Sequence, residues 1–197
     1  MNPMEQLEAI QEYCRELFET DSSGHDFYHL KRVARLASQI AKEKGADYFI
    51  CVAGAWLHDV GDHKLFLHPQ QAFSEMDQFL NMIKISDDKI EDIHLAIEDI
   101  SFSKGRIPST IEGKIIQDAD RVDAIGAIGI ARTFAYGGAK GQLIYHDEKR
   151  EGTSVQHFYD KILTLKDTLH TEGARQEAEK RHAFVEAYLE QFFNEWD

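Results

Sequence analysis

Residues 26–62, DFYHLKRVARLASQIAKEKGADYFICVAGAWLHDVGD, carry the pattern that decides the fold. Apolar side chains recur in this stretch every three or four residues, which is the period of an amphipathic helix and not the two-residue alternation of a strand. We expect a first helix over residues 26–44 that ends at Gly45, a residue type that caps helices well. Its inner face carries His29, Val33, Leu36 and Ile40.

A second helix is expected over residues 46–60, and it is apolar along most of its length. One face carries Tyr48, Cys51, Val52, Ala55 and Asp59. His58 lies on the flank of that face, because neighbouring residues of a helix are about 100° apart. Both helices therefore direct ionisable side chains towards the protein interior, where an isolated charge is costly.

The rest of the chain shows the same helical spacing. Further helices are expected at about residues 4–18, 70–83 and 87–100, followed by a loop at 102–109, one long buried helix at 111–135, a glycine-rich loop at 137–141 and two C-terminal helices within 153–196. The last helix carries an aromatic stripe that we interpret as core packing: Phe184, Tyr188, Phe192 and Trp196. The predicted fold is all-α, a single-domain helical bundle over residues 1–197 with its motif-bearing core at about 20–135 and the C-terminal helices packed on it.

The composition is typical of one acidic globular domain. The chain has 197 residues, 43% of them hydrophobic, so burial can offset the entropy lost on folding. A formal net charge of −13 opposes binding to a nucleic-acid polymer or an anionic membrane. A small anionic substrate is compatible with this charge, because a bound divalent cation reverses the local field. The sequence contains no apolar run that could span a bilayer and no signal-peptide core, so we expect a cytoplasmic protein.

Four ionisable residues on three of the predicted helices are candidate metal ligands: His29, His58, Asp59 and Asp120. A carboxylate on a buried helix either takes up a proton or faces a cation, and a neutral imidazole suits the same cation. Each residue alone has a simpler interpretation. The pair His58 and Asp59 is compatible with a solvated helix end, and a lone inward histidine is usually a core residue with a hydrogen-bond partner. The combination favours one shared site.

The order of these residues resembles a known family. His29 lies within HDFYHLKRVARLA, His58 and Asp59 lie within LHDVGD, and Asp120 lies within DADRVDAIGAIGIAR. This arrangement resembles the HD-domain superfamily of metal-dependent phosphohydrolases, over residues 25 to about 135. The residues around the motifs are similar to those of small stand-alone bacterial HD proteins, some of which are nucleotide pyrophosphohydrolases.

The resemblance implies a mechanism and a cofactor. Two histidines and two aspartates would hold one divalent metal ion, and this mixed donor set does not select among Mn, Co, Ni, Fe, Mg and Zn. The ion would act as Lewis acid and water activator in hydrolysis of a phosphorylated small molecule, with a nucleoside triphosphate pyrophosphohydrolase as the leading hypothesis. The alternatives are a nucleoside monophosphate phosphatase of the 5'-nucleotidase type and a non-catalytic sensor of metal or nucleotide.

Further residues are expected around the metal. The family carries an acid at the position of Asp62, which is assigned as the catalytic base or water-orienting group, with a solvated acid as the alternative. Lys64 and Lys104 are candidate substrate-binding residues, although either is compatible with a solvated surface lysine.

Two acids are expected in supporting positions. Asp26 is expected either to accept a hydrogen bond from a ligand imidazole or to cap its helix, and Asp123 is a second candidate to orient a ligand. Asp118 is a competitor for that role. Arg121 is expected to pair with one of these acids. Of His94, His146 and His157, the histidines that could suggest a second metal, only His94 lies between the histidine-aspartate pair and Asp120, so we favour a single metal.

Overall fold

The computed structural model describes residues 1–196, and these form helices and loops with no strand. The α-helices are α1 (Pro3–Phe18), α2 (Phe27–Lys44), α3 (Tyr48–Leu57), α4 (Pro69–Met82), α5 (Asp87–Ile97), α6 (Ile111–Asp123), α7 (Gly126–Ala139), α8 (Ser154–Asp160) and α9 (Glu172–Trp196). Two short 3-10 helices, η1 (Phe102–Lys104) and η2 (Ile162–Thr168), complete them. The all-α prediction is confirmed.

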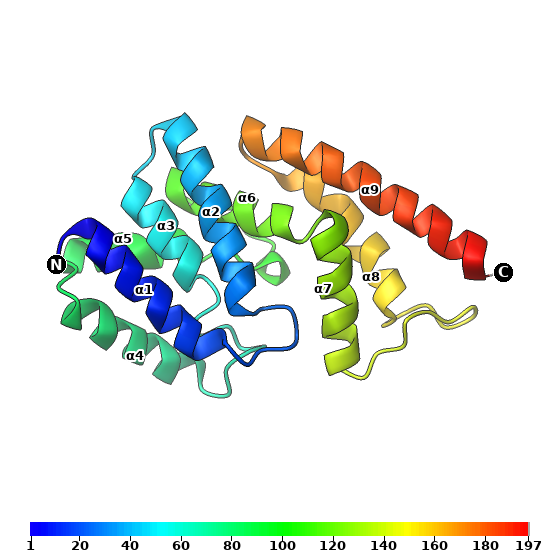
Figure 1. The fold of residues 1–197 in the computed structure, drawn as a ribbon, viewed down its shortest axis with the longest axis horizontal. Helices are drawn as coiled ribbons and strands as arrows, with labels where there is room; N and C mark the ends of the chain where they lie inside the picture. The colour runs from blue at the N-terminus through cyan, green and yellow to red at the C-terminus, as the bar shows by residue number, and fades with distance from the viewer. Residues whose placement is uncertain (197) are drawn as a thin grey trace.

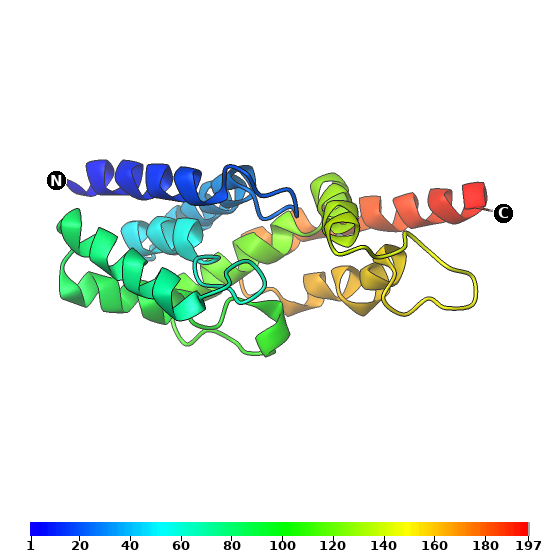
Figure 2. The ribbon, with the colours of Figure 1, turned by 90° about the horizontal axis from the view of Figure 1, so that it is seen from below.

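The helices form two groups along an elongated molecule, with the chain termini at opposite ends (Figures 1 and 2). Helices α1 to α6 gather around α3, which contacts α1, α2, α5 and α6. Helices α7, α8 and α9 form the second group, and α9 packs against α7 and also contacts α6 (Figure 1). One continuous cluster of buried apolar side chains extends through both groups, so the structure is a single domain.

Local signals at the helix ends explain how α2 and α3 are placed. The carboxylate of Asp26 accepts a hydrogen bond from the backbone N–H of His29 at 2.7 Å and starts α2. Gly45 ends this helix in the left-handed conformation, at φ 67°, which glycine adopts without steric cost. Asp47 then caps α3 by accepting from the N–H of Ile50 at 3.0 Å. All of α3 after Tyr48 is buried, which is why its sequence is almost uniformly apolar.

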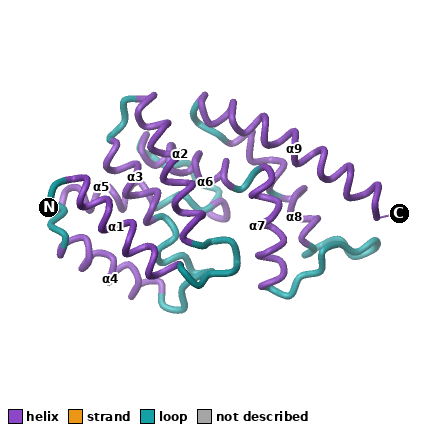
Figure 3. Tube along the Cα trace, viewed as in Figure 1, coloured by secondary structure: helices purple, strands orange, loops and turns teal. Residues whose placement is uncertain are grey.

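The prediction of one long helix over residues 111–135 is wrong. The chain breaks after Asp123, and α7 begins at Gly126, whose φ is 86°. A side chain at this glycine would meet Arg181 of α9 at 3.1 Å, so both the conformation and the close approach require glycine. Apolar residues keep their helical spacing across the break, so the sequence pattern gives no sign of the turn between Asp123 and Gly126. The turn directs α7 into the second group of helices (Figure 3).

Three smaller predictions also need correction. The expected loop at 137–141 begins too early, because α7 continues to Ala139. Helix α3 ends at Leu57 and the chain turns through Gly61, whose φ is 77°. The aromatic stripe of α9 is only partly core: Tyr188 and Phe192 pack against the buried cluster, whereas Phe184 is 53% and Trp196 is 43% exposed. Only one side of α9 faces other helices, so a stripe along its whole length cannot be buried.

No helix in the described part of the chain combines the length and the apolar character needed to cross a membrane.

Candidate metal centre and pocket

His29 of α2 is buried, and a hydrogen bond fixes its ring. Its Nδ1 donates to Oδ2 of Asp123, on α6, at 2.8 Å. Since Asp123 is an acceptor at this bond, the proton of the neutral ring is on Nδ1 and the lone pair is on Nε2. The Nε2 atom is buried and has no hydrogen-bond partner in the described residues. A buried acceptor without a protein partner is costly, and it is typical of a nitrogen that ligates a metal ion.

His58 repeats this arrangement at the end of α3. Its Nδ1 donates to the backbone carbonyl of Ala55 at 2.9 Å, and its side chain is 2% exposed. Its Nε2 is likewise buried and has no partner within residues 1–196. The two rings lie edge to face with their centroids 5.4 Å apart. Two imidazoles from different helices therefore present their free nitrogens to the same space.

Two carboxylates face these nitrogens. The Oδ2 and Oδ1 atoms of Asp59 lie 3.5 Å from Nε2 of His29 and of His58, respectively. Oδ1 of Asp120 lies 3.6 Å from the first nitrogen and 3.8 Å from the second. These separations are too long for good hydrogen bonds. They suit a shared ion, because two ligands held about 2.1 Å from one metal lie roughly 3 to 3.5 Å apart.

The donor set fits a divalent metal ion. His29, His58 and Asp120 offer ligand atoms that all lie within 4.8 Å of one another. Asp59 is outside that group of three but borders both imidazoles, and its Oδ2 is a third buried atom without a hydrogen bond in the described residues. A cation between these side chains would satisfy three otherwise unpartnered buried atoms at once.

The pKa shifts in the cluster arise from the same close contact between histidines and aspartates. Burial raises the pKa of Asp59 and of Asp120, but the neighbouring histidines outweigh burial and hold both below their usual range. Burial lowers the pKa of His58, whereas Asp59 and Asp120 raise it, with a net value of about 9. The carboxylates thus attract positive charge to this point, whether it is a proton or a metal ion.

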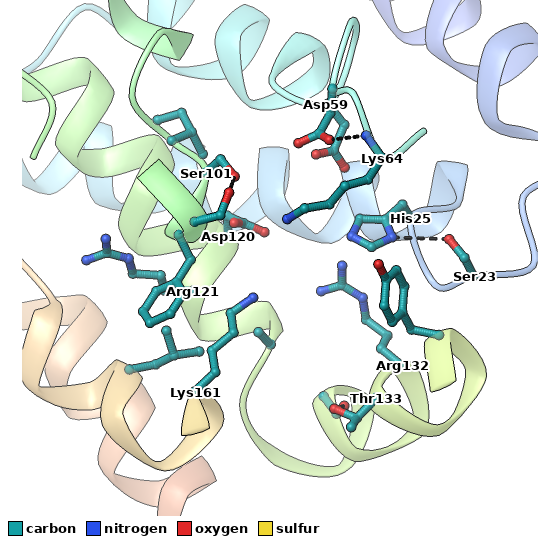
Figure 4. A pocket seen from close by; sticks show the side chains of 18 of the residues that line it. Ser23, His25, Asp59, Lys64, Ser101, Asp120, Arg121, Arg132, Thr133 and Lys161 are labelled. Carbon is teal, nitrogen blue, oxygen red and sulfur yellow. Dashed lines mark hydrogen bonds between the residues drawn. The ribbon is translucent and has the colours of Figure 1, made fainter. Parts of the chain in front are cut away.

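The cluster lies at the wall of a hollow of about 380 Å³ between the two groups of helices. Figure 4 shows Asp59 and Asp120 on one side of this pocket and Arg132 and Lys161 on the other. His25 also lines it, and burial lowers the pKa of His25 to about 4. His25 is therefore neutral at physiological pH and can donate or accept a hydrogen bond.

Asp62 and Lys64 both line this pocket. Asp62 does not continue α3, because the helix ends at Leu57 and the chain turns at Gly61. The turn nevertheless keeps Asp62 near the cluster, since its N–H donates to the carbonyl of Asp59 at 3.2 Å. Oδ1 of Asp62 accepts from the backbone N–H of Lys64 at 2.7 Å, which fixes the carboxylate and starts the segment that carries the lysine.

Lys104 is not in the same pocket. It lines a neighbouring hollow of about 610 Å³ beyond Ser101 and Ser103, and its ammonium group donates to the backbone carbonyl of Glu98. The structure therefore separates the two lysines that the sequence placed together. The two hollows share part of their walls, including His58 and Asp62.

The supporting acids divide into three different roles. Asp123 contacts the imidazole of His29, while Asp26 caps α2 and, in the described residues, forms no hydrogen bond with an imidazole ring. Asp118 turns away from the cluster and accepts hydrogen bonds from the N–H groups of His170 and Thr171, at 2.8 and 2.7 Å. It thereby holds the start of α9.

The predicted ion pair of Arg121 is absent from the described residues. One guanidinium nitrogen of Arg121 donates to the carbonyl of Thr168 at 2.7 Å, and its Nε is buried with no partner among residues 1–196. The residue ties α6 to the second group of helices, because the neighbouring acids on α6 are already turned towards other partners.

Asp123 is the acid with the most charged contacts. It is buried and accepts from His29, from Arg32 at 2.7 and 3.0 Å, and from Arg132 at 3.0 Å. Burial raises the pKa of Asp123, but these donors outweigh it and keep the pKa below its usual range. One ionised carboxylate therefore fixes a candidate ligand and a pocket cation together.

Sequence reasoning missed His25, Arg132 and Lys161 as pocket residues. His25 and Arg132 lie inside the quoted motifs, but helical spacing does not indicate that they face the candidate ligands. Lys161 follows α8, outside any motif, and reaches the pocket only because the second group of helices folds against the first. No local signal identifies it.

Comparison with known proteins finds a family model and several relatives that match this chain. The family model of the HD domain matches residues 26–125. The chain is 39% identical to the uncharacterised protein YpgQ of Bacillus subtilis over 195 residues, which cover 97% of this chain and 94% of YpgQ.

Solved structures agree with this match. The crystal structure of B. subtilis YpgQ in complex with ADP superposes with a TM-score of 0.86 and 36% identity, covering 99% of this chain and 97% of the other. An HD-superfamily hydrolase from Bacillus thuringiensis gives a TM-score of 0.80 and 39% identity, covering 99% and 98%. The likeness extends over both groups of helices, including the part of the chain after residue 125.

Proposed function

The chain belongs to the HD domain family, and we propose that it is a metal-dependent phosphohydrolase that acts on nucleotides. One observation carries the proposal. Within residues 1–196, Nε2 of His29, Nε2 of His58 and Oδ2 of Asp59 are buried without hydrogen bonds. They border the same point, in the wall of a pocket that also contains cationic side chains. A metal ion would satisfy these atoms, and the cations would face a phosphorylated substrate.

We assign the ion to His29, His58, Asp59 and Asp120. The mixture of nitrogen and oxygen donors suits one divalent ion, and Mn, Co, Ni, Fe, Mg and Zn are all compatible with it. Such an ion would polarise a phosphoryl oxygen and activate a water molecule. Asp123 would orient the imidazole of His29 through its hydrogen bond, so that Nε2 keeps its position.

The nucleotide is the substrate class that the relatives support. YpgQ of B. subtilis has been crystallised with ADP, and the protein from B. thuringiensis is described as an HD-superfamily hydrolase. Both are similar to this chain over almost its whole length, and this likeness supports a similar ligand for the pocket described above.

The reaction that we propose converts a nucleoside triphosphate into the monophosphate and pyrophosphate. The oxygen of water forms a bond to the α-phosphorus, while the bond from that phosphorus to the bridging oxygen breaks, and the bridging oxygen leaves with pyrophosphate. We assign Asp62 to accept the proton that the water loses, because its carboxylate lines the pocket beside the cluster. Lys64, on the same segment, is assigned to bind a phosphate.

The test compares the wild-type protein with Asp59→Ala after loading with Mn²⁺. Nucleoside mono- and triphosphates are offered separately, and orthophosphate and pyrophosphate are measured as distinct products. We expect pyrophosphate from triphosphates, and turnover roughly 1000-fold lower in the variant, since a metal contributes several kcal/mol to such a reaction. Equal turnover by the two proteins would refute the proposal.

Two other results would point elsewhere. Orthophosphate released from monophosphates alone would identify a nucleotidase. Metal-dependent binding of nucleotide without turnover, under each of the six metals, would identify a sensor.

A further inference from the structure

Besides Arg121, whose guanidinium group donates to the carbonyl of Thr168, three cationic side chains line the pocket from separate segments. Lys64 follows α3, Arg132 belongs to α7 and Lys161 follows α8. Figure 4 shows the ends of these side chains pointing into the same hollow, with Asp59 and Asp120 at its border. Two of the three segments belong to the second group of helices, so the pocket has a metal-binding side and a cationic side.

The cations are poorly neutralised by protein groups. In the described part of the chain, neither Lys64 nor Lys161 forms an ion pair with a carboxylate. Arg132 is held by the carbonyl of Gly24 at 2.7 Å and by Asp123 at 3.0 Å. Asp123 also accepts from His29 and Arg32, so its charge is shared among three partners.

Lys161 is the most confined of the three. It is half-buried, and its ammonium group lies 5.2 Å from the centroid of the Phe102 ring. Burial and the charges of Lys64 and Arg132 lower the pKa of Lys161, against the opposite effect of Asp120. Cations that repel one another in a confined space are stabilised by an anion that contacts them together.

The number and position of these charges favour a particular anion. The phosphate that is attacked has to contact the metal side, near Asp59 and Asp120. A monophosphate carries a charge of about −2, which one divalent metal ion already balances, so the cations would stay largely unneutralised. A pyrophosphate group attached to that phosphate can extend across the pocket and contact the cationic side.

We propose that Lys64, Arg132 and Lys161 form a binding site for pyrophosphate, both as the end of a triphosphate substrate and as the product, and that Lys161 determines the preference for triphosphates over monophosphates. The preference for triphosphates rests on the proposed function, because it requires turnover of a nucleotide. The binding of pyrophosphate itself does not require turnover and can be measured separately.

Lys161 is the residue of choice for the test. Substitution of Arg132 would release Asp123 and thereby disturb His29, so a loss of activity would have two explanations. Lys161 has no hydrogen bond from its side chain to a candidate ligand, and it lies in the chain far from them. Lys166, on the same segment but outside the pocket lining, provides a matched control for the loss of one positive charge.

The experiment uses Lys161→Met, Lys161→Arg and Lys166→Met, each loaded with Mn²⁺. Inhibition of triphosphate hydrolysis is measured with inorganic pyrophosphate and, separately, with nucleoside monophosphate. We expect Lys161→Met to weaken pyrophosphate inhibition and to raise KM for the triphosphate, each roughly 10- to 100-fold, as for loss of a charged hydrogen bond. In Lys161→Met, inhibition by the monophosphate should change less than about twofold. Lys161→Arg should keep most of the wild-type inhibition by pyrophosphate, and Lys166→Met should resemble the wild type.

The contrary results are equally defined. If Lys161→Met weakens the inhibition by pyrophosphate and the inhibition by monophosphate to the same degree, or weakens neither, Lys161 does not select the longer phosphate chain. If the wild-type protein hydrolyses no nucleotide, the proposed function fails. Calorimetric titration of the Mn²⁺-loaded proteins with inorganic pyrophosphate then decides the inference alone, because equal binding by the wild type and Lys161→Met would overturn it.

Discussion

The two sides of the pocket differ in how their charges are held. On the metal side, each imidazole is fixed through Nδ1 by an acceptor of the protein, and the candidate ligands come from helices packed around α3. On the cationic side, two of the three charges end long lysine side chains without a carboxylate partner in the described residues. The comparison indicates that the first side is organised before any ligand arrives, whereas the second depends on the ligand for its neutralisation.

Asp123 connects the two sides. Its carboxylate contacts His29 on the metal side and Arg132 on the cationic side. The two sides are therefore not independent, and substitutions on either side can test the difference between them. The following predictions are ordered from the largest expected effect to the smallest.

Removal of a metal-side carboxylate should have the largest effect. In Asp120→Ala, the ion loses an oxygen donor and the two Nε2 atoms lose their negative neighbour. We expect turnover to fall roughly 1000-fold or more. Steady-state kinetics at saturating Mn²⁺, with elemental analysis of the purified protein, would check this. A variant that keeps both its metal and its turnover would contradict the assignment of Asp120.

A second prediction compares two buried acids on α6. Asp123→Asn keeps the shape of the side chain but removes the charge that holds His29, so metal affinity should fall roughly 10- to 100-fold. Asp118→Asn removes a charge that holds the start of α9, so it should lower the free energy of unfolding by roughly 1–3 kcal/mol.

Metal titration followed by denaturant unfolding measures both quantities in each variant. Metal affinity should remain near the wild-type value in Asp118→Asn. The division of roles between the two acids is wrong if their effects on metal affinity are the same.

A third prediction concerns thermal stability. Ligand binding to the folded state stabilises it by mass action, by about 2.7 kcal/mol when the ligand is at 100 times its Kd. For a chain of this size, we expect Mn²⁺ to raise Tm by roughly 5–10 °C. Calorimetric scans with Mn²⁺ and with a chelator would show the difference, and Asp59→Ala should lack it. An unchanged Tm in the wild type would argue that the inward histidines and acids simply satisfy one another.

The smallest effect is expected at Lys104. Its ammonium group donates to the carbonyl of Glu98 and lines the neighbouring hollow, outside the pocket that contains Lys161. We expect Lys104→Met to change kcat/KM for a triphosphate less than about twofold. Kinetics beside Lys161→Met would sharpen the comparison between cations inside and outside the pocket, and a loss as large as that of Lys161→Met would extend the cationic side to Lys104.

The helices that carry the candidate ligands could be predicted from sequence because their signals are local. Asp26, Gly45 and Asp47 act within a few residues of the helix ends that they define. The same reasoning failed over residues 111–135, because apolar spacing continues through the break at Gly126. The requirement for glycine there arises from Arg181, which belongs to a helix far along the chain.

The all-α class and the group His29, His58, Asp59 and Asp120 could be predicted from the amino-acid order, and these four side chains lie close together in the structure. Buried ionisable residues at helical spacing are recognisable without coordinates, because their burial is costly unless they share a partner. The contact of Asp123 with His29, the contact of Asp118 with the start of α9 and the position of Lys161 in the same pocket are visible in the three-dimensional structure alone. These relations join segments that are distant in the chain, and the packing of one helix group on the other creates them.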